Sequence, residues 1–115
     1  MNWIEIKSES DLNEAIKKSF QTSFGVVIFK HSTRCSISSV AKMRLTSFWN
    51  FKEELPVYYL DLIVFRNISN LIADKFEVRH ESPQLLVIKD GKCVYNASHL
   101  SISVKDLRFH LEVEN

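Results

Sequence analysis

Glycine, proline and cysteine are scarce in this sequence, which has two of each among its 115 residues. The scarcity leaves no linker or low-complexity tract, so each glycine and proline marks a boundary between elements. No apolar run approaches the roughly 20 residues that cross a bilayer. The N-terminus also lacks a basic segment followed by an apolar stretch. We therefore expect no signal peptide, no membrane partner and a location in the cytoplasm.

Neither sign of charge dominates, because 15 basic residues face 14 acidic ones and the net charge is +1. No basic stripe forms along the chain, so the electrostatic footprint of a nucleic-acid binder is missing and we expect no such partner. Apolar residues make up 45% of the chain and charged residues 25%, which is ordinary for a domain with a buried core.

The apolar pattern changes several times between strand-like alternation and helical spacing. The run Gly25–Lys30 is rich in β-branched and aromatic residues, which is typical of a central parallel strand covered on both faces. Asp90 and Gly91 between two strand-like runs predict a hairpin. The expected strands are residues 3–6, 25–30, 57–61, 83–89 and 92–95.

Four helices are expected between and after these strands. The first begins after an N-cap at Ser8 or Ser10, and the others cover about 36–50, 68–76 and 104–113. Apolar residues at helical spacing predict the buried faces. These are Leu12, Ile16 and Phe20, then Val40, Met43 or Leu45, and Phe48, then Leu71, Ile72 and Phe76, and finally Leu107 and Leu111.

The elements follow the order β-α-β-α-β-α-β-β-α, which predicts an α/β fold with a mixed sheet flanked by helices. Alternating strands and helices require right-handed crossovers and parallel strands, and the closing hairpin adds antiparallel strands at one edge. The length suits a single domain that spans residues 1–115.

Cys35 falls between the second strand and the second helix, at the carboxyl edge of the sheet where sites form in open α/β folds. The helix dipole and the unpaired N–H groups there stabilise a thiolate. Lys30, His31 and Arg34 place positive charge nearby in the sequence. We therefore predict an exposed, reactive thiol for disulfide exchange. The alternative is a packed core cysteine, which the polar neighbours disfavour.

Ser38 completes a Cys-x-x-Ser arrangement, so a second thiol that could resolve a disulfide within the chain is missing at that position. Cys35 would then act as a single-thiol centre or rely on an outside thiol. Ser38 is also placed to hydrogen-bond the backbone of the first helical turn. We interpret Cys93 as a small core or edge-strand residue.

Metal binding has little support in the sequence. No Cys-x-x-Cys pair exists, and no Cys/His cluster has the spacing of zinc ligands. His80, His99 and His110 are therefore expected to be structural or solvated, and both cysteines to be thiols in a reducing compartment. We expect no cofactor and no metal.

Several stretches, in collinear order from about residue 20 to residue 105, resemble the monothiol bacilliredoxin family, thioredoxin-like proteins of the bacillithiol system. The resemblance implies a thioredoxin-like fold. The stretches are Phe29–Ser38, Pro56–Leu60, His80–Gln84, Asp90–Lys92 and Ser98–His99.

The resemblance implies that Cys35 takes bacillithiol from S-bacillithiolated proteins, and that another thiol then clears the mixed disulfide. Pro83 matches the cis-proline that faces the active cysteine in thioredoxin-like folds, so Ser82 would expose backbone groups to an extended substrate. The implied partners are S-thiolated proteins, a low-molecular-weight thiol such as bacillithiol, and a disulfide reductase. The candidate catalytic residues are Cys35 and Ser38, and the candidate substrate-binding residues are Lys30, His31, Thr33, Arg34, Ser82 and Pro83.

Two positions depart from related patterns. Ser36 stands where the family usually has proline, which should alter the redox poise more than the fold. Phe29 stands where dithiol thioredoxins carry a buried acid, so no proton-transfer residue is available for a resolving step. This second departure agrees with single-thiol chemistry.

Two other functions remain open. Monothiol glutaredoxins hold an iron–sulfur cluster between two subunits with an added thiol, and Cys35 could serve as such a ligand. Ser36 stands where those carriers have glycine, which disfavours this alternative. The other is an adaptor that presents a peptide groove without turnover, because a fold does not imply a function.

Overall fold

The computed structural model describes residues 1–51 and 55–114. Its strands are β1 (Trp3–Glu5), β2 (Val26–His31), β3 (Val57–Asp61), β4 (Gln84–Lys89) and β5 (Lys92–Ser98). Its helices are α1 (Glu9–Lys18), α2 (Ser36–Phe48), α3 (Arg66–Phe76) and α4 (Val104–Glu114), with a short 3-10 helix at His99–Ser101. The predicted order of elements is confirmed. None of the helices in the described residues is long and apolar enough to cross a membrane.

The five strands form one mixed sheet in the order β1-β3-β2-β4-β5. Strands β1, β3 and β2 are parallel, whereas β4 is antiparallel to β2 and β5 is antiparallel to β4. The turn between β4 and β5 has positive φ at both Asp90 and Gly91, as a type I′ hairpin requires. The predicted α/β fold with a mixed sheet is therefore confirmed.

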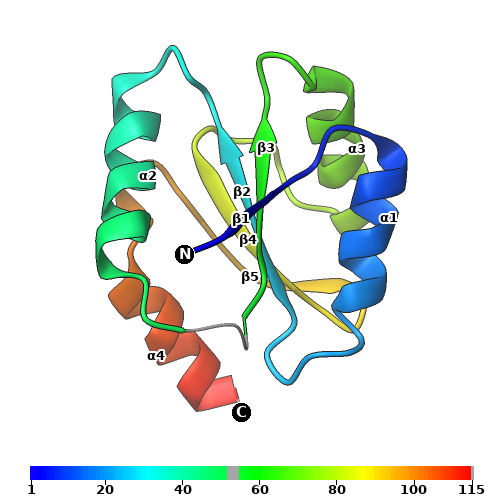
Figure 1. Cartoon of the computed structure of the whole chain (residues 1–115), viewed down its shortest axis with the longest axis vertical. Coiled ribbons are helices and arrows are strands. Elements are labelled where there is room, and N and C mark those ends of the chain that lie inside the picture. The colour runs from blue at the N-terminus through cyan, green and yellow to red at the C-terminus, as the bar shows by residue number, and fades with distance from the viewer. Residues whose placement is uncertain (52–54, 115) are drawn as a thin grey trace.

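Helices cover both faces of the sheet, with α2 and α4 on one side and α1 and α3 on the other (Figure 1). Every residue of β2 is buried, as the continuous apolar run predicted. Alternate residues of β2 enter the two cores. Val27 and Phe29 lie in the core under α2 and α4, whereas Val26 and Ile28 lie in the core under α1 and α3.

Two predicted helix faces need correction. In α2, Val40, Met43 and Phe48 are exposed, whereas Leu45, the alternative to Met43, is buried as predicted, together with Ser38 and Ala41. Small side chains at two of these three positions let the helix lie close to the sheet, whereas the larger apolar ones point outward. Phe20 is also exposed, because α1 ends at Lys18 before reaching it.

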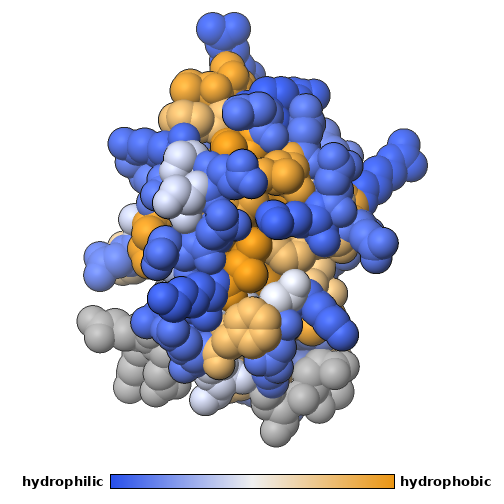
Figure 2. Space-filling model, turned by 90° about the vertical axis from the view of Figure 1, so that its right-hand side faces the viewer, coloured by the Kyte–Doolittle hydropathy of each residue, from blue (hydrophilic) through white to orange (hydrophobic). Residues whose placement is uncertain are grey.

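The other predicted faces hold. Leu12, Ile72, Phe76, Leu107 and Leu111 are buried, while Ile16 and Leu71 are partly buried against the core under α1 and α3. The surface that carries α1 and α3 is mainly hydrophilic, with separate apolar patches between the polar side chains (Figure 2).

Candidate active site

Cys35 immediately precedes α2 and is its N-cap, with an extended backbone (φ −110°, ψ 122°). Its carbonyl accepts a hydrogen bond from Ser39 N–H at 3.1 Å, and its own N–H donates to the Ser32 carbonyl at 3.2 Å. The residue is half-buried, not exposed as the sequence predicted. Its position places the thiol beside the unpaired N–H groups of the first helical turn.

The strand register brings three segments to the same edge of the sheet. Asp61 at the end of β3 pairs with His31 at the end of β2, and Gln84 at the start of β4 pairs with Lys30. The Cys35 loop and the segment ending at Pro83 therefore meet at this edge. The Ser82–Pro83 peptide bond is cis, as the sequence resemblance implied.

Ser38 is fully buried and ties the first turn of α2 to the end of β2. Its Oγ accepts a hydrogen bond from Ser32 N–H at 2.9 Å and lies 2.6 Å from His31 Nδ1. The side chain of Ser38 is therefore committed to the loop that holds Cys35. This network fixes the backbone on both sides of the nucleophile.

His31 is buried between aromatic rings, with its ring centroid 5.7 Å from that of Phe29 and 5.6 Å from that of Tyr59. Burial lowers the pKa of His31, and the positive charge of Lys42 lowers it further, against the opposing effects of Asp61 and the Ser38 hydrogen bond. His31 is therefore neutral at pH 7 and does not supply the positive charge that the sequence suggested.

Lys30 points to the other face of the sheet, toward α3. Its Nζ donates to the Ser69 carbonyl at 3.1 Å and lies 3.4 Å from His80 Nδ1. Burial of the side chain, with a smaller effect from the positive charge of Arg66, lowers the pKa of Lys30 to about 8. The structure therefore does not bring the Lys30 ammonium together with Cys35, although the two are close in sequence.

Four further candidates line the same edge. Thr33 and Arg34 are exposed in the loop before Cys35. Pro83 is buried, and its carbonyl accepts a hydrogen bond from His99 N–H at 3.0 Å. The backbone N–H and carbonyl of Ser82 form no hydrogen bond with the part of the chain that the structure describes.

Sequence reasoning missed one cluster near Pro83. Ser98 Oγ donates to Glu81 Oε2, and His99 Nδ1 lies 3.9 Å from the same carboxylate oxygen. His99 also has a positive φ of 55°. The pairing of Gln84 with Ser98 places these groups at the edge that carries Cys35. The hairpin prediction could have located them, since it fixes which ends of β4 and β5 meet.

Comparison with known proteins identifies the family. A family model described as Monothiol bacilliredoxin BrxC matches residues 4–107. The chain belongs to the monothiol bacilliredoxin family. A solved structure described as a proposed oxidoreductase with a thioredoxin fold is 31% identical, with a TM-score of 0.79, over 95% of this chain and 92% of that one.

More distant structures share the thioredoxin fold. Thioredoxin O1 from Arabidopsis thaliana is 18% identical with a TM-score of 0.72, over 98% of this chain and 97% of that one. Thioredoxin from Fasciola hepatica is also 18% identical with a TM-score of 0.72, over 97% and 99%. The family and the fold are those of thiol–disulfide oxidoreductases.

The second cysteine lies away from the edge of the sheet that carries Cys35. Cys93 is half-buried near the start of β5, opposite Ile88, and borders the core under α1 and α3. Its Sγ donates to the Tyr95 carbonyl at 3.3 Å, and burial raises the pKa of its thiol. This environment disfavours the reactive thiolate and agrees with the interpretation of Cys93 as a core or edge residue.

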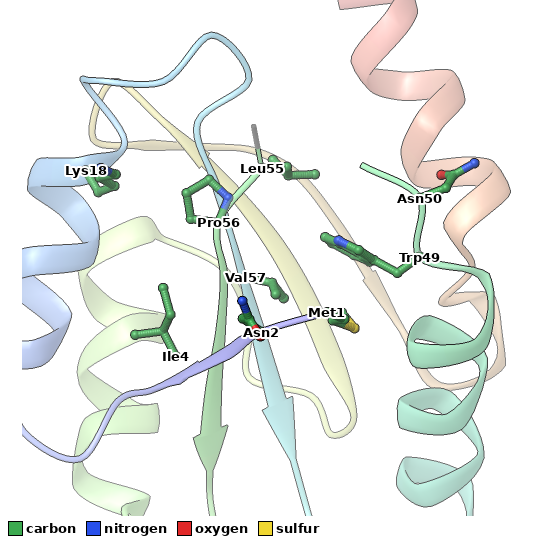
Figure 3. A pocket seen from close by; sticks show the side chains of 9 residues that line it. All are labelled: Met1, Asn2, Ile4, Lys18, Trp49, Asn50, Leu55, Pro56 and Val57. Atoms are coloured by element: carbon green, nitrogen blue, oxygen red, sulfur yellow. The ribbon is translucent and has the colours of Figure 1, made fainter. Parts of the chain in front are cut away.

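A hollow of about 500 Å³ lies at the amino end of β3, opposite the edge that carries Cys35 (Figure 3). Side chains from the N-terminal segment, the end of α1 and the chain around β3 line it, together with Trp49 and Asn50. Lys18 is the basic side chain of the lining, and no lining residue carries a thiol. No group of three or more His, Cys, Asp or Glu within the described residues is arranged to hold a metal ion.

We predict that Ser38→Ala destabilises the protein without removing its chemistry. The substitution leaves the partly buried Ser32 N–H without its acceptor and the buried His31 without its partner, which costs about 1–3 kcal/mol. Urea unfolding of both proteins measures the loss. The hydroxyl has no redox role in this interpretation, so an unchanged free energy of unfolding would contradict the structural role of Ser38.

Proposed function

We propose that this chain is a single-thiol oxidoreductase that removes a low-molecular-weight thiol, bacillithiol, from protein mixed disulfides through Cys35. The observation that carries the proposal is the arrangement of Cys35 before α2, with a buried Ser38 at the position of a second thiol in Cys-x-x-Cys motifs. A serine hydroxyl cannot form a disulfide. The adduct on Cys35 therefore leaves only by attack from outside the chain.

The reaction proceeds by two thiol–disulfide exchanges. The Cys35 thiolate attacks the small-thiol sulfur of a protein mixed disulfide, the old S–S bond breaks, and the protein thiolate leaves and takes up a proton. A second small-thiol molecule then attacks the Cys35 adduct as its thiolate. This step releases a symmetric small-molecule disulfide and restores the Cys35 thiolate. A disulfide reductase returns the small disulfide to two thiols with electrons from its own donor.

The protein part of the substrate binds at the cis-proline segment. The free backbone groups of Ser82 pair with an extended segment of the substrate, as an added strand does. Exposed Thr33 and Arg34 contact it from the Cys35 loop. Lys30 does not contact the substrate. Its Nζ lies beside His80, at the start of the segment that carries Ser82 and Pro83, and so helps to position that segment.

We assign the reaction to the cytoplasm, where thiols persist in the reduced form. The partners are S-thiolated proteins, the small thiol and the reductase. No resident cofactor or metal takes part in the two exchanges, because sulfur atoms carry all of the electrons.

Intact-mass spectrometry tests this function. Reduced protein is incubated with the disulfide of bacillithiol and, separately, with oxidised glutathione, and the modified cysteine is located by peptide mapping. We expect one adduct, on Cys35, that added free thiol removes. Modification of Cys93 alone, or of neither cysteine, would overturn the proposal. A brown protein after anaerobic purification would instead favour the iron–sulfur carrier.

A further inference from the structure

A hollow of about 370 Å³ runs along one side of α2, close to the nucleophile. Cys35, Ser39, Lys42 and Thr46 follow one another at spacings of four, three and four residues, so they lie on one face of the helix. The lining residues of the hollow are His31, Ser39, Lys42, Met43, Thr46 and Ser47. The hollow therefore begins one helical turn beyond Cys35.

Lys42 lines this hollow and a second one. The second hollow has a volume of about 580 Å³ and is lined by Trp3, Ile4, Glu5, Lys42 and Tyr59. The Lys42 ammonium lies 4.9 Å from the centroid of the Tyr59 ring. Its charge also lowers the pKa of His31, the effect second to burial, which places it near the floor of the first hollow. The two hollows share Lys42 in their linings, and together they are called the groove below.

Two carboxylates near Lys42 have other partners: Glu5 lines the second hollow, and the charge of Asp61 acts to raise the pKa of His31. Glu5 pairs with Lys7 at 3.0 Å, and the Asp61 carboxylate accepts hydrogen bonds from the N–H groups of Ile63 and Val64 at 3.0 and 3.4 Å. Lys42 forms no ion pair with any acidic residue in the described ranges. The groove therefore offers a cation without a carboxylate partner, beside hydroxyl groups.

We propose that this groove binds the non-sulfur part of the small thiol while its sulfur is joined to Cys35, and that Lys42 binds a carboxylate of that thiol. The inference rests on the proposed function and adds where the non-sulfur part of the small thiol binds and which side chain takes its carboxylate. Ser39 contacts its polar groups on the way from Cys35 to Lys42.

The dimensions agree with such a ligand. Lys42 follows Cys35 by seven positions along α2, a rise of roughly 10 Å. The sulfur of a tripeptide such as glutathione lies on its middle residue, so sulfur and terminal carboxylate are about two residue lengths apart, roughly 7 Å. The long, flexible side chain of Lys42 can span the remainder, whereas a two-carbon thiol carries no group that reaches it.

Oxidised glutathione serves as the probe, since it has tripeptide arms that end in carboxylates. Its ethyl ester matches it in size but lacks the carboxylate at the glycine end, and hydroxyethyl disulfide is short and neutral. The measured quantity is the rate constant for adduct formation on Cys35 with each disulfide, followed by mass. Wild type is compared with Lys42→Glu and with the matched control Arg44→Glu. Arg44 lies on the same helix but lines a different hollow, between α2 and α4.

We expect Lys42→Glu to slow adduct formation with oxidised glutathione by about tenfold, the order of one charge-assisted contact. The rate with hydroxyethyl disulfide stays unchanged, the ester is slowed less than the acid, and Arg44→Glu slows the acid by no more than about twofold. Equal slowing by both substitutions would overturn the inference, since net charge alone would then explain it. Equal slowing with all three disulfides would also overturn it, because Lys42 would then affect the reactivity of the Cys35 thiol and not bind a carboxylate of the ligand.

Failure of the proposed function gives a separate result. In that case wild-type Cys35 forms no adduct with any of the three disulfides, and the comparison of variants is not reached. If adducts form at the same rate in wild type and Lys42→Glu, the function stands and the groove is not the binding site.

Discussion

We expect Cys35→Ser to reduce the release of small thiol from an S-thiolated protein to the rate measured without enzyme. Serine cannot form the mixed disulfide, and its hydroxyl is far less acidic than a thiol, so neither exchange can occur through residue 35. The structure offers no substitute, because the other cysteine, Cys93, is half-buried and borders the opposite core cluster. The measurement is the release of small thiol from a purified S-thiolated protein, followed by mass.

Two variants serve as matched controls. Cys93→Ser removes the other thiol and should retain nearly the full rate. Ser38→Ala, assayed well below its unfolding temperature, should also retain most of it, because Ser38 holds the loop and does not exchange electrons. Turnover by Cys35→Ser above the background rate, or loss of turnover in Cys93→Ser, would show that the chemistry does not run through Cys35 alone.

The second large effect concerns stability. Lys30 has its pKa lowered to about 8 in the folded protein, from an ordinary value of 10.5. Between these values the unfolded chain binds more protons than the folded one, so the Lys30 contribution raises the free energy of unfolding as pH increases. A shift of this size corresponds to about 3 kcal/mol. The stabilisation is complete above pH 10.5 and is lost as pH falls to about 8.

Lys30→Met isolates this contribution. The lost hydrogen bond to the Ser69 carbonyl costs the same at every pH, whereas the cost of burying the ammonium exists only in wild type and only below the pKa of its unfolded form. Tyrosines and Cys93 titrate equally in both proteins and cancel in the comparison. We therefore expect the stability of wild type relative to Lys30→Met to rise by about 3 kcal/mol between pH 7.5 and 10.5.

Urea unfolding at intervals of pH, with a reductant present, measures both profiles. Parallel profiles would show that the Lys30 ammonium is as well solvated as in the unfolded chain. Arg66→Gln provides a second check, because Arg66 contributes the smaller part of the pKa shift. Removing its charge should raise the pKa of Lys30. The contribution of Lys30 to the pH dependence of the free energy of unfolding should then become smaller.

Much of the fold follows from local patterns in the sequence. The buried run in β2 and the Asp90-Gly91 turn identify the central strand and the hairpin, because both features depend on neighbouring residues only. The face of α2 does not follow in this way. Val40, Met43 and Phe48 have helical spacing and are apolar, yet close approach to the sheet requires the small side chains of Ser38 and Ala41.

For the site, too, local patterns in the sequence predict only the features that do not depend on packing. The position of Cys35 directly before α2 and the cis bond before Pro83 are predicted correctly, since one is set by a strand-to-helix junction and the other by a specific motif. The opposite directions of Lys30 and His31 follow from strand alternation, but their partners on α3 and α2 depend on packing. The position of Lys42 over Tyr59 depends on how α2 lies across β3, which no local pattern reports.

The engagement of Ser38 has a kinetic consequence for the proposed cycle. The Ser38 hydroxyl is held by Ser32 and His31 and, being no thiol, cannot displace a small thiol from Cys35. The occupied form of the protein, with a small thiol joined to Cys35, therefore has no internal route back to the free thiol at this position. The lifetime of that form is then inversely proportional to the concentration of free small thiol. When the supply of reduced thiol falls, the protein accumulates in its occupied form, and the ratio of the two forms reports the state of the thiol pool.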